Sequence, residues 1–142
     1  MSVIVVGADH SLGAKEALRF ALEETRFRRA RLRIVHAIGG FGSYPSLAVD
    51  VSAVHRAAEE LIENATREAS SEDSGVQIER RVVEGAPGAV LVEESRDADL
   101  LVVGSRGHGG FAGLLLGSVS QQCAHHAECP VVIVRAPSET SD

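Results

Sequence analysis

Short apolar runs alternate along this chain with longer segments that have the spacing of helices. Val3–Val6 and Leu100–Val103 contain only apolar side chains, which is typical of strands that are buried on both faces of a sheet. After the first run, the apolar residues of segment 14–22 recur three and four positions apart, as on one face of a helix. Strands that alternate with helices predict an α/β fold in which helices cover both faces of a parallel sheet.

Five strands are expected, with four helices between them. The strands are predicted at Val3–Val6, Leu32–Ala37, Val76–Val83, Leu100–Val103 and Val131–Val134. Ser11 is the expected N-cap of the first helix, and Pro87 is expected in the first turn of the third helix. Ser118 with Gln121 three residues later predicts a capping box at the start of the fourth helix.

The order of the strands follows from two features. Val76–Val83 alternates apolar and polar side chains, with Gln77, Glu79 and Arg81 expected to face outward, so this strand is placed at an edge of the sheet. Glycine-rich segments follow the first and fourth strands, which are therefore placed side by side at the centre. An open five-stranded parallel sheet with the strand order 3-2-1-4-5 satisfies both conditions.

This strand order also predicts where a ligand would bind. The chain reverses direction between the first and fourth strands, and ligands of open α/β sheets bind in the crevice at the carboxyl ends of such strands. The segments that line this crevice are Gly7–Asp9 and Gly104–Gly117.

Length and charge narrow the classes of protein that fit. The 142 residues suit a single domain over residues 1–142. A net charge of -6 disfavours nucleic-acid binding, which depends on neutralising phosphates. Five arginines lie between Arg26 and Arg33, and we interpret them as the solvated end of a helix. No apolar run approaches the roughly 18 residues that span a bilayer, and the first residues do not resemble a signal peptide, so we expect a cytoplasmic protein without membrane contact.

The cysteines and the paired histidines do not indicate a metal site. Cys123 and Cys129 are six residues apart, which fits neither a zinc site nor a thioredoxin-type motif. We expect both thiols to be small core residues. His125 and His126 are adjacent, and adjacent residues on a helix point about 100° apart, so a shared metal ion is not expected.

The segment between the fourth strand and the fourth helix is the most informative part of the sequence. Six glycines fall within Gly104–Gly117, and glycine lets a ligand approach the backbone without a Cβ in the way. Consecutive loop N–H groups and a helix N-terminus form an anion site, to which Ser118 and Ser120 could add hydroxyl donors and Arg106 a cation. The segment is neither a Walker A loop nor a dinucleotide-binding loop. A phosphate-bearing ligand is therefore favoured, and the alternative is a connector that needs glycine for tight turns.

The spacing Gly104-x2-Gly107-x9-Gly117-Ser118 resembles the G-2x-G-9x-G-(S/T) signature of ATP-binding universal stress proteins. The resemblance covers essentially the whole chain and is also carried by Val3–Ser11, Val35–Ala37, Glu84–Pro87 and Cys129–Val134. It implies a Rossmann-like fold of the adenine nucleotide alpha hydrolase type, with ATP and magnesium as ligands.

The resemblance further implies roles for individual residues. Ala8 and Asp9 would contact the nucleotide, and Asp9 would face the ribose or coordinate magnesium. The alternative for Asp9 is a turn or N-cap aspartate. The backbone of Ala37 would contact the adenine edge and Val103 would wall the adenine pocket, although both positions also suit ordinary packing. The expected ribose and phosphate contacts are Gly104, Arg106, Gly107, His108 and Gly109, followed by Gly117, Ser118, Val119 and Ser120 at the helix start. Arg106 and His108 are alternatively solvated loop side chains.

The leading interpretation is an ATP-binding regulatory or stress-response module. A dedicated enzyme is not favoured, because no general base is evident beyond Asp9, and any ATP hydrolysis is expected to be slow. One alternative is an interaction module of the same family that works without nucleotide. Another is a response-regulator-like phosphoacceptor, which is disfavoured because Glu84–Pro87, and no acceptor aspartate, follows the third strand.

The fifth strand predicts a homodimer. Val131–Val134 is apolar on both faces, yet the inferred strand order places it at an edge. An exposed apolar edge strand pairs readily with another chain, and many members of the resembled family look like dimers joined through this strand. The alternative is that a helix or the segment 136–142 covers the edge.

Overall fold

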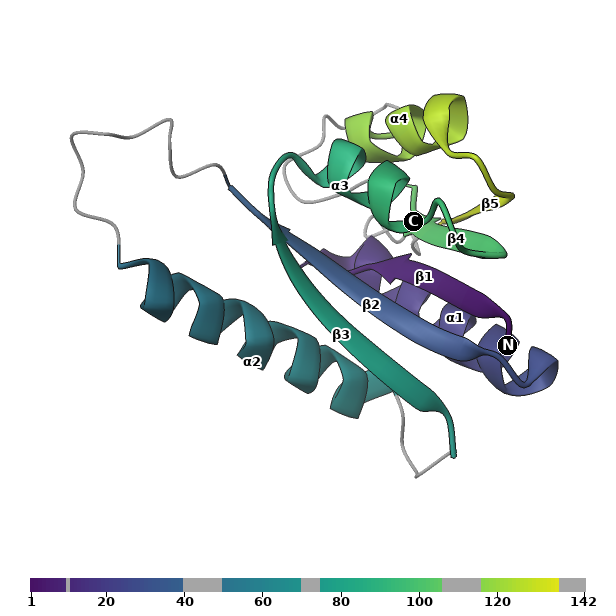
Figure 1. The fold of residues 1–142 in the computed structure, drawn as a ribbon, viewed down its shortest axis with the longest axis horizontal. Coiled ribbons are helices and arrows are strands. Elements are labelled where there is room, and N and C mark those ends of the chain that lie inside the picture. The colour runs from purple at the N-terminus through teal and green to yellow at the C-terminus, as the bar shows by residue number, and fades with distance from the viewer. Residues whose placement is uncertain (10, 40–49, 70–74, 106–115, 136–142) are drawn as a thin grey trace, which may run out of the picture.

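The computed structural model describes residues 1–9, 11–39, 50–69, 75–105 and 116–135. Strands and helices alternate through these ranges, with β1 at Val3–Gly7, α1 at Leu12–Arg28, β2 at Arg31–Ile38, α2 at Val51–Ala69, β3 at Gln77–Glu84, α3 at Pro87–Glu94, β4 at Leu100–Gly104, α4 at Ser118–His126 and β5 at Val131–Val134. The strands form one parallel sheet in the order β3-β2-β1-β4-β5 (Figure 1). The predicted fold class and strand order are confirmed.

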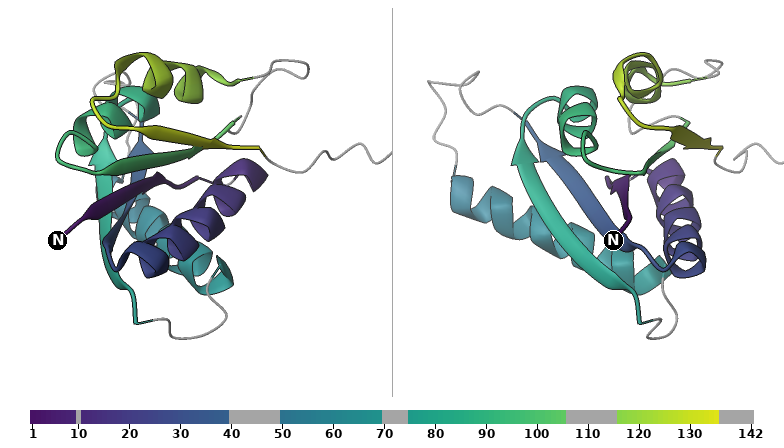
Figure 2. Two further views of the ribbon diagram at one scale, coloured as in Figure 1. Left: turned by 90° about the vertical axis from the view of Figure 1, so that its right-hand side faces the viewer. Right: turned by 45° about the vertical axis from the view of Figure 1, so that its right-hand side comes forward.

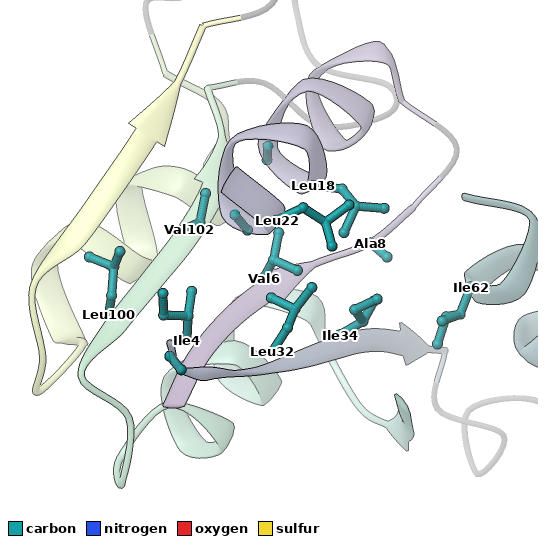
Figure 3. Close-up of a cluster of buried hydrophobic side chains, with 13 residues drawn as sticks. Ile4, Val6, Ala8, Leu18, Leu22, Leu32, Ile34, Ile62, Leu100 and Val102 are labelled. Atoms are coloured by element: carbon teal, nitrogen blue, oxygen red, sulfur yellow. The ribbon is translucent and has the colours of Figure 1, made fainter. Parts of the chain in front are cut away.

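Helices cover the sheet on both faces, as predicted. α1 and α2 pack on one face and α3 and α4 on the other (Figure 2). The α1 side of the sheet buries a cluster of aliphatic side chains from β1, β2 and β4 against Leu18 and Leu22 of α1 (Figure 3). Ile4, Val5 and Val6 of β1 are fully buried, because the wholly apolar run lies at the centre of the sheet with helices on each side.

The edge strand β3 departs from the prediction in one respect. Glu79 and Arg81 are not simply solvated, because both form ion pairs. Glu79 Oε1 lies 2.9 Å from Nε of Arg33 on β2, and Nη2 of Arg81 donates to Oε2 of Glu94 at the end of α3, at 3.2 Å. These pairs place charged side chains along the outer strand, which discourages pairing with another sheet.

The cluster of arginines divides between two elements. Arg26 and Arg28 occupy the last turn of α1, and Arg29 ends the helix in a left-handed conformation (φ 56°, ψ 42°), so the interpretation as a helix end is confirmed for these three. It is wrong for Arg31 and Arg33, which lie on β2, and the side chain of Arg33 is only 12% exposed. That guanidinium bonds Glu79, Asp97 and the carbonyl of Glu94, and the hydrogen bond with Asp97 raises its pKa further above the ordinary value.

The two cysteines differ in burial. Cys123 of α4 is fully buried, and burial raises the pKa of its thiol to about 11. Cys129 is half-buried and packs against the same cluster of side chains. The prediction of core residues is therefore confirmed for Cys123 and met in part for Cys129. In the part of the chain that the structure describes, no helix is long and apolar enough to cross a membrane.

Candidate functional site

The first turn of α1 is held by two polar side chains of the β1–α1 turn. Oγ of Ser11 accepts a hydrogen bond from the backbone N–H of Ala14 at 3.1 Å, which confirms Ser11 as the N-cap. Oδ1 of Asp9 accepts from the N–H of Ser11 at 2.7 Å. Asp9 is thus a turn aspartate, and within the described ranges its second oxygen, Oδ2, has no hydrogen-bond partner. That oxygen is the one that could reach a ligand.

β4 ends in close contact with the start of α1. A Cβ built on Gly104 would lie 2.8 Å from the carbonyl carbon of Gly13 and 2.9 Å from its oxygen. Because these neighbours are backbone atoms, no rotamer change could make room for a side chain. The structure therefore requires glycine at position 104 for packing, independently of any ligand. Gly13 was not singled out from the sequence, although a glycine within the first turn of a helix is a usable signal of close packing.

One carbonyl holds together the two ends of the segment between β4 and α4. The oxygen of Ser105 accepts hydrogen bonds from the N–H of Gly117 at 2.6 Å and from Oγ of Ser120 at 2.8 Å. The Ser120 hydroxyl is buried and also lies 3.0 Å from the carbonyl of Gly117. The Ser120 side chain, expected as a phosphate contact, is thus directed at the backbone.

The N-terminus of α4 differs from the prediction. Gly117 is the N-cap residue, with extended backbone angles (φ -80°, ψ 174°), and Ser118 is already the first helical residue. The predicted capping box is therefore wrong. Gln121 instead donates from Nε2 to the carbonyl of Leu116 at 3.1 Å. Because Gly117 has no side chain, the N-cap residue itself offers no oxygen to the N–H groups of the first turn.

The first turn of α4 therefore contains N–H groups that have no partner among the described residues. Among the hydrogen bonds of the described residues, none uses the backbone N–H of Ser118, Val119 or Ser120. Such groups at the start of a helix point along its axis and attract negative charge. Ser118 is exposed and Val119 half-buried, whereas Gly117 and Ser120 are buried. This arrangement suits a phosphate.

Ala37 lies where β1 and β2 part. Ala8, the residue after β1, still donates its N–H to the carbonyl of Val35 at 2.8 Å. In a parallel ladder, alternate residues bond to opposite neighbours, so Val35 and Ala37 direct their backbone groups toward β1, and Ile38 bonds Gly85 on the β3 side. In the described part of the chain no backbone hydrogen bond joins Ala37 to β1. One donor and one acceptor therefore remain at the edge of the crevice.

The other expected contacts are placed as follows. The side chain of Ala8 belongs to the buried cluster around α1, beside Val6 and Leu18 (Figure 3). Val103 is buried on the opposite face, where Ala37 packs against the same cluster. Arg106, Gly107, His108 and Gly109 lie outside the described residues. Within the described residues, no group of three histidine, cysteine or acidic side chains could hold a metal ion.

Comparison with known proteins agrees with this architecture. The model of the universal stress protein family matches residues 1–135. Universal stress protein Rv2623 of Mycobacterium tuberculosis is 34% identical over 132 residues, which are 93% of this chain and 44% of that protein. Universal stress protein Rv2624c of the same organism is 35% identical over 136 residues, 96% of this chain and 49% of that protein. The chain thus spans about half the length of these curated relatives.

Two solved structures are similar over almost the whole chain. A universal stress protein in complex with cAMP has a TM-score of 0.68 and 32% identity, and the match covers 94% of this chain and 95% of that one. A universal stress protein from Archaeoglobus fulgidus in complex with dAMP has a TM-score of 0.71 and 26% identity, covering 94% and 98%. The strand order, the sequence match and these likenesses together show that the chain belongs to the universal stress protein family.

Proposed function

We propose that this chain binds an adenine nucleotide, ATP above others, at the carboxyl ends of its central strands and acts as a nucleotide-dependent regulatory module in the cytoplasm. The observation that carries the proposal is the first turn of α4, which has no side-chain cap and whose N–H groups have no partner among the described residues, so that they suit a phosphate. Related proteins in complex with cAMP and dAMP support an adenine nucleotide as the ligand class.

The two ends of such a ligand have matching groups on the protein. The N–H and C=O of Ala37 offer one donor and one acceptor, which complement the ring nitrogens and the amino group of adenine. The phosphates would lie at Gly117, Ser118 and Val119. Gly104, Arg106, Gly107, His108 and Gly109, from the same glycine-rich segment, remain the proposed ribose and phosphate contacts.

Asp9 is the proposed contact to magnesium or ribose. Its unpartnered Oδ2 fits one position in the shell of a magnesium ion, which in nucleotide sites is held by one or two carboxylates together with phosphates and water. Bound magnesium would offset the charge of the phosphates. If Asp9 holds magnesium, replacing it by Asn should weaken magnesium-dependent ATP binding and leave AMP binding unchanged, whereas a contact to the ribose would make the same variant weaken the binding of both nucleotides.

Isothermal titration calorimetry tests the proposal directly. Protein stripped of bound nucleotide is titrated with ATP, AMP and cAMP, each with and without magnesium. We expect a dissociation constant of about 1 µM or weaker for ATP, which corresponds to roughly -8 kcal/mol and is within reach of an apolar slot with several amide donors. Absence of saturation at millimolar ATP with magnesium would contradict the proposal.

The alternative, a dimeric interaction module that needs no nucleotide, is favoured by one observation, the apolar edge strand β5. All four of its residues are partly exposed, and Val132 and Val134 pack toward α1 whereas Val131 and Ile133 pack toward α3 and α4. We propose a homodimer through Val131–Val134 on a two-fold axis. Nucleotide binding and dimerisation are compatible, because they use different parts of the sheet.

The ladder with β4 indicates how to test the dimer. The carbonyls of Pro130 and Val134 accept from β4 and from Ser105, so alternation directs the N–H of Ile133 to the open edge. Ile133→Pro removes this N–H, whereas Ile133→Ala loses the same side-chain packing and keeps the N–H. Light scattering should find Ile133→Ala dimeric and Ile133→Pro monomeric. A wild-type monomer at tens of micromolar would refute the dimer.

A further inference from the structure

A side chain, rather than a backbone group, ends the ladder between β1 and β2. Nδ1 of His36 lies 2.7 Å from the carbonyl oxygen of Ala8. A carbonyl oxygen only accepts hydrogen bonds, so Nδ1 must carry the hydrogen, and in the neutral imidazole Nε2 is then the acceptor. The side chain of His36 is partly buried, which protects this bond from competition with water.

This bond occupies a position that backbone pairing would otherwise use. Because the N–H of Ala8 bonds to the carbonyl of Val35, the next rung of a regular parallel ladder would run from the N–H of Ala37 to the carbonyl of Ala8. The described residues contain no such backbone bond, and the register of β1 with β2 ends at the pair Gly7 and Val35. His36 thus supplies the donor that Ala37 would have supplied.

We propose that His36 is a positioning residue for base recognition: by drawing the carbonyl of Ala8 to its own Nδ1, out of line with the N–H of Ala37, it stops the β1–β2 ladder and keeps that N–H available to the edge of a purine base. This inference rests on the proposed function, because it takes the base to be bound at Ala37. It assigns His36 no contact with the nucleotide. Its role is to set which backbone groups face the crevice.

Replacement of His36 by Leu tests the role in the ladder without any ligand. In His36→Leu the carbonyl of Ala8 loses its donor, and burial of an unpaired carbonyl is costly, so the N–H of Ala37 should move onto it. Amide hydrogen exchange at Ala37, followed by NMR in nucleotide-free protein, should then slow by at least about tenfold. Unchanged exchange at Ala37 in a folded His36→Leu variant would overturn the proposal.

Nucleotide affinity provides the second measurement. The dissociation constant for AMP should rise about tenfold in His36→Leu, the effect of one lost hydrogen bond. In His36→Asn the side-chain amide offers an N–H close to the position of Nδ1, so the affinity should return to within about threefold of wild type. The matched control is His126→Leu in the last turn of α4, an exposed position, which should bind AMP as wild type does. Equal loss in the Leu and Asn variants would refute the positioning role.

A third measurement covers the case in which His36→Leu does not fold. The nitrogen-15 shifts of the imidazole in wild-type protein report which nitrogen carries the hydrogen, and a neutral ring with hydrogen on Nε2 would refute the proposal. These measurements also distinguish failure of the proposed nucleotide binding from failure of the proposed role of His36. Wild-type protein that fails to bind any adenine nucleotide contradicts the proposed function, whereas exchange at Ala37 still decides whether His36 ends the ladder.

Discussion

The first turns of α1 and α4 lie at the same edge of the sheet but satisfy their backbone N–H groups in different ways. In α1, Ser11 accepts from Ala14, and Asp9 accepts from Ser11. In α4 the N-cap is Gly117, which has no side chain, and no side chain of the described residues caps the first turn. The hydroxyl of Ser120 is directed at the carbonyl of Ser105. Two helices that follow adjacent strands therefore differ in that α1 has a side-chain cap at its N-terminus and α4 has none within the described ranges.

At this one edge of the sheet, the first turn of α1 contributes to stability and the first turn of α4 is available for binding. A capped first turn adds roughly 1 kcal/mol to stability and leaves fewer N–H groups for a ligand. An uncapped first turn gives up that contribution and keeps the positive end of the helix available to an anion. The comparison predicts that changes at Ser11 alter stability, whereas changes at Gly117 alter nucleotide affinity.

The largest effect is expected for Gly117→Val. The extended backbone at Gly117 is accessible to valine, so the circular dichroism spectrum should stay close to that of wild type. The two Cγ atoms would occupy the place of the anion, and calorimetry should show a loss of ATP affinity of at least about a hundredfold, as several amide–phosphate bonds are lost together. Gly117→Ala, which adds only Cβ, should lose less. An unchanged affinity in a folded Gly117→Val variant would contradict the role of the α4 N-terminus.

Gly117→Asp would give α4 a side-chain N-cap, as Ser11 does for α1. Its carboxylate should cap the first turn and raise the free energy of unfolding by a few tenths of a kcal/mol. The same carboxylate would repel phosphate, and ATP affinity should fall about tenfold. Thermal unfolding and calorimetry on the same sample check both halves of the prediction. If the variant is more stable to unfolding than wild type and still binds ATP with the affinity of wild type, the cap and the ligand do not compete and the prediction is wrong.

Ser11→Ala should have the smallest effect on binding. Loss of the bond between Ser11 and Ala14 is expected to cost about 1 kcal/mol of stability, which lowers the melting temperature by about 2–4 °C in a protein of this size. ATP affinity should change by less than about threefold, since a cap that serves only the helix contributes nothing to the ligand. Ser2→Ala, at an exposed position, is the control. A large loss of affinity in Ser11→Ala would mean that both helix termini serve the ligand.

The parts of the fold that were predictable are those in which composition alone decides the environment. Val3–Val6 and Leu100–Val103 contain no polar side chain, which suits strands with helices on both faces, and both lie in the interior of the sheet. Val131–Val134 is equally apolar and lies at an edge, so the glycine-rich segments after the first and fourth strands were needed to place those two at the centre. The capping box at Ser118 and Gln121 was wrong because the choice between Gly117 and Ser118 as N-cap depends on the bond from Gly117 to Ser105, twelve residues away. The residues around Gly117 do not indicate that its N–H will bond to Ser105.

The candidate site was predictable in its position and not in its detail. Glycine-rich segments after two adjacent strands indicate a crevice, but the spacing does not say which glycines serve a ligand. Gly104 has a packing reason in the backbone of Gly13. His36 lies within an otherwise apolar part of its strand, and its hydrogen bond to Ala8 depends on the register of β1 with β2, which only the folded sheet defines.

The contact between Gly13 and Gly104 also has a mechanical consequence. Where two elements meet through side chains, a change of rotamer can absorb a small displacement of one of them. Here the backbone of Gly104 lies against the backbone of Gly13, so no side chain can adjust. We expect a displacement of the first turn of α1 toward the sheet to press directly on the backbone of β4, which pairs with β5 at Gly104 and Val134. The turn that carries Asp9 is thus connected to the outer strand of the sheet through backbone contacts.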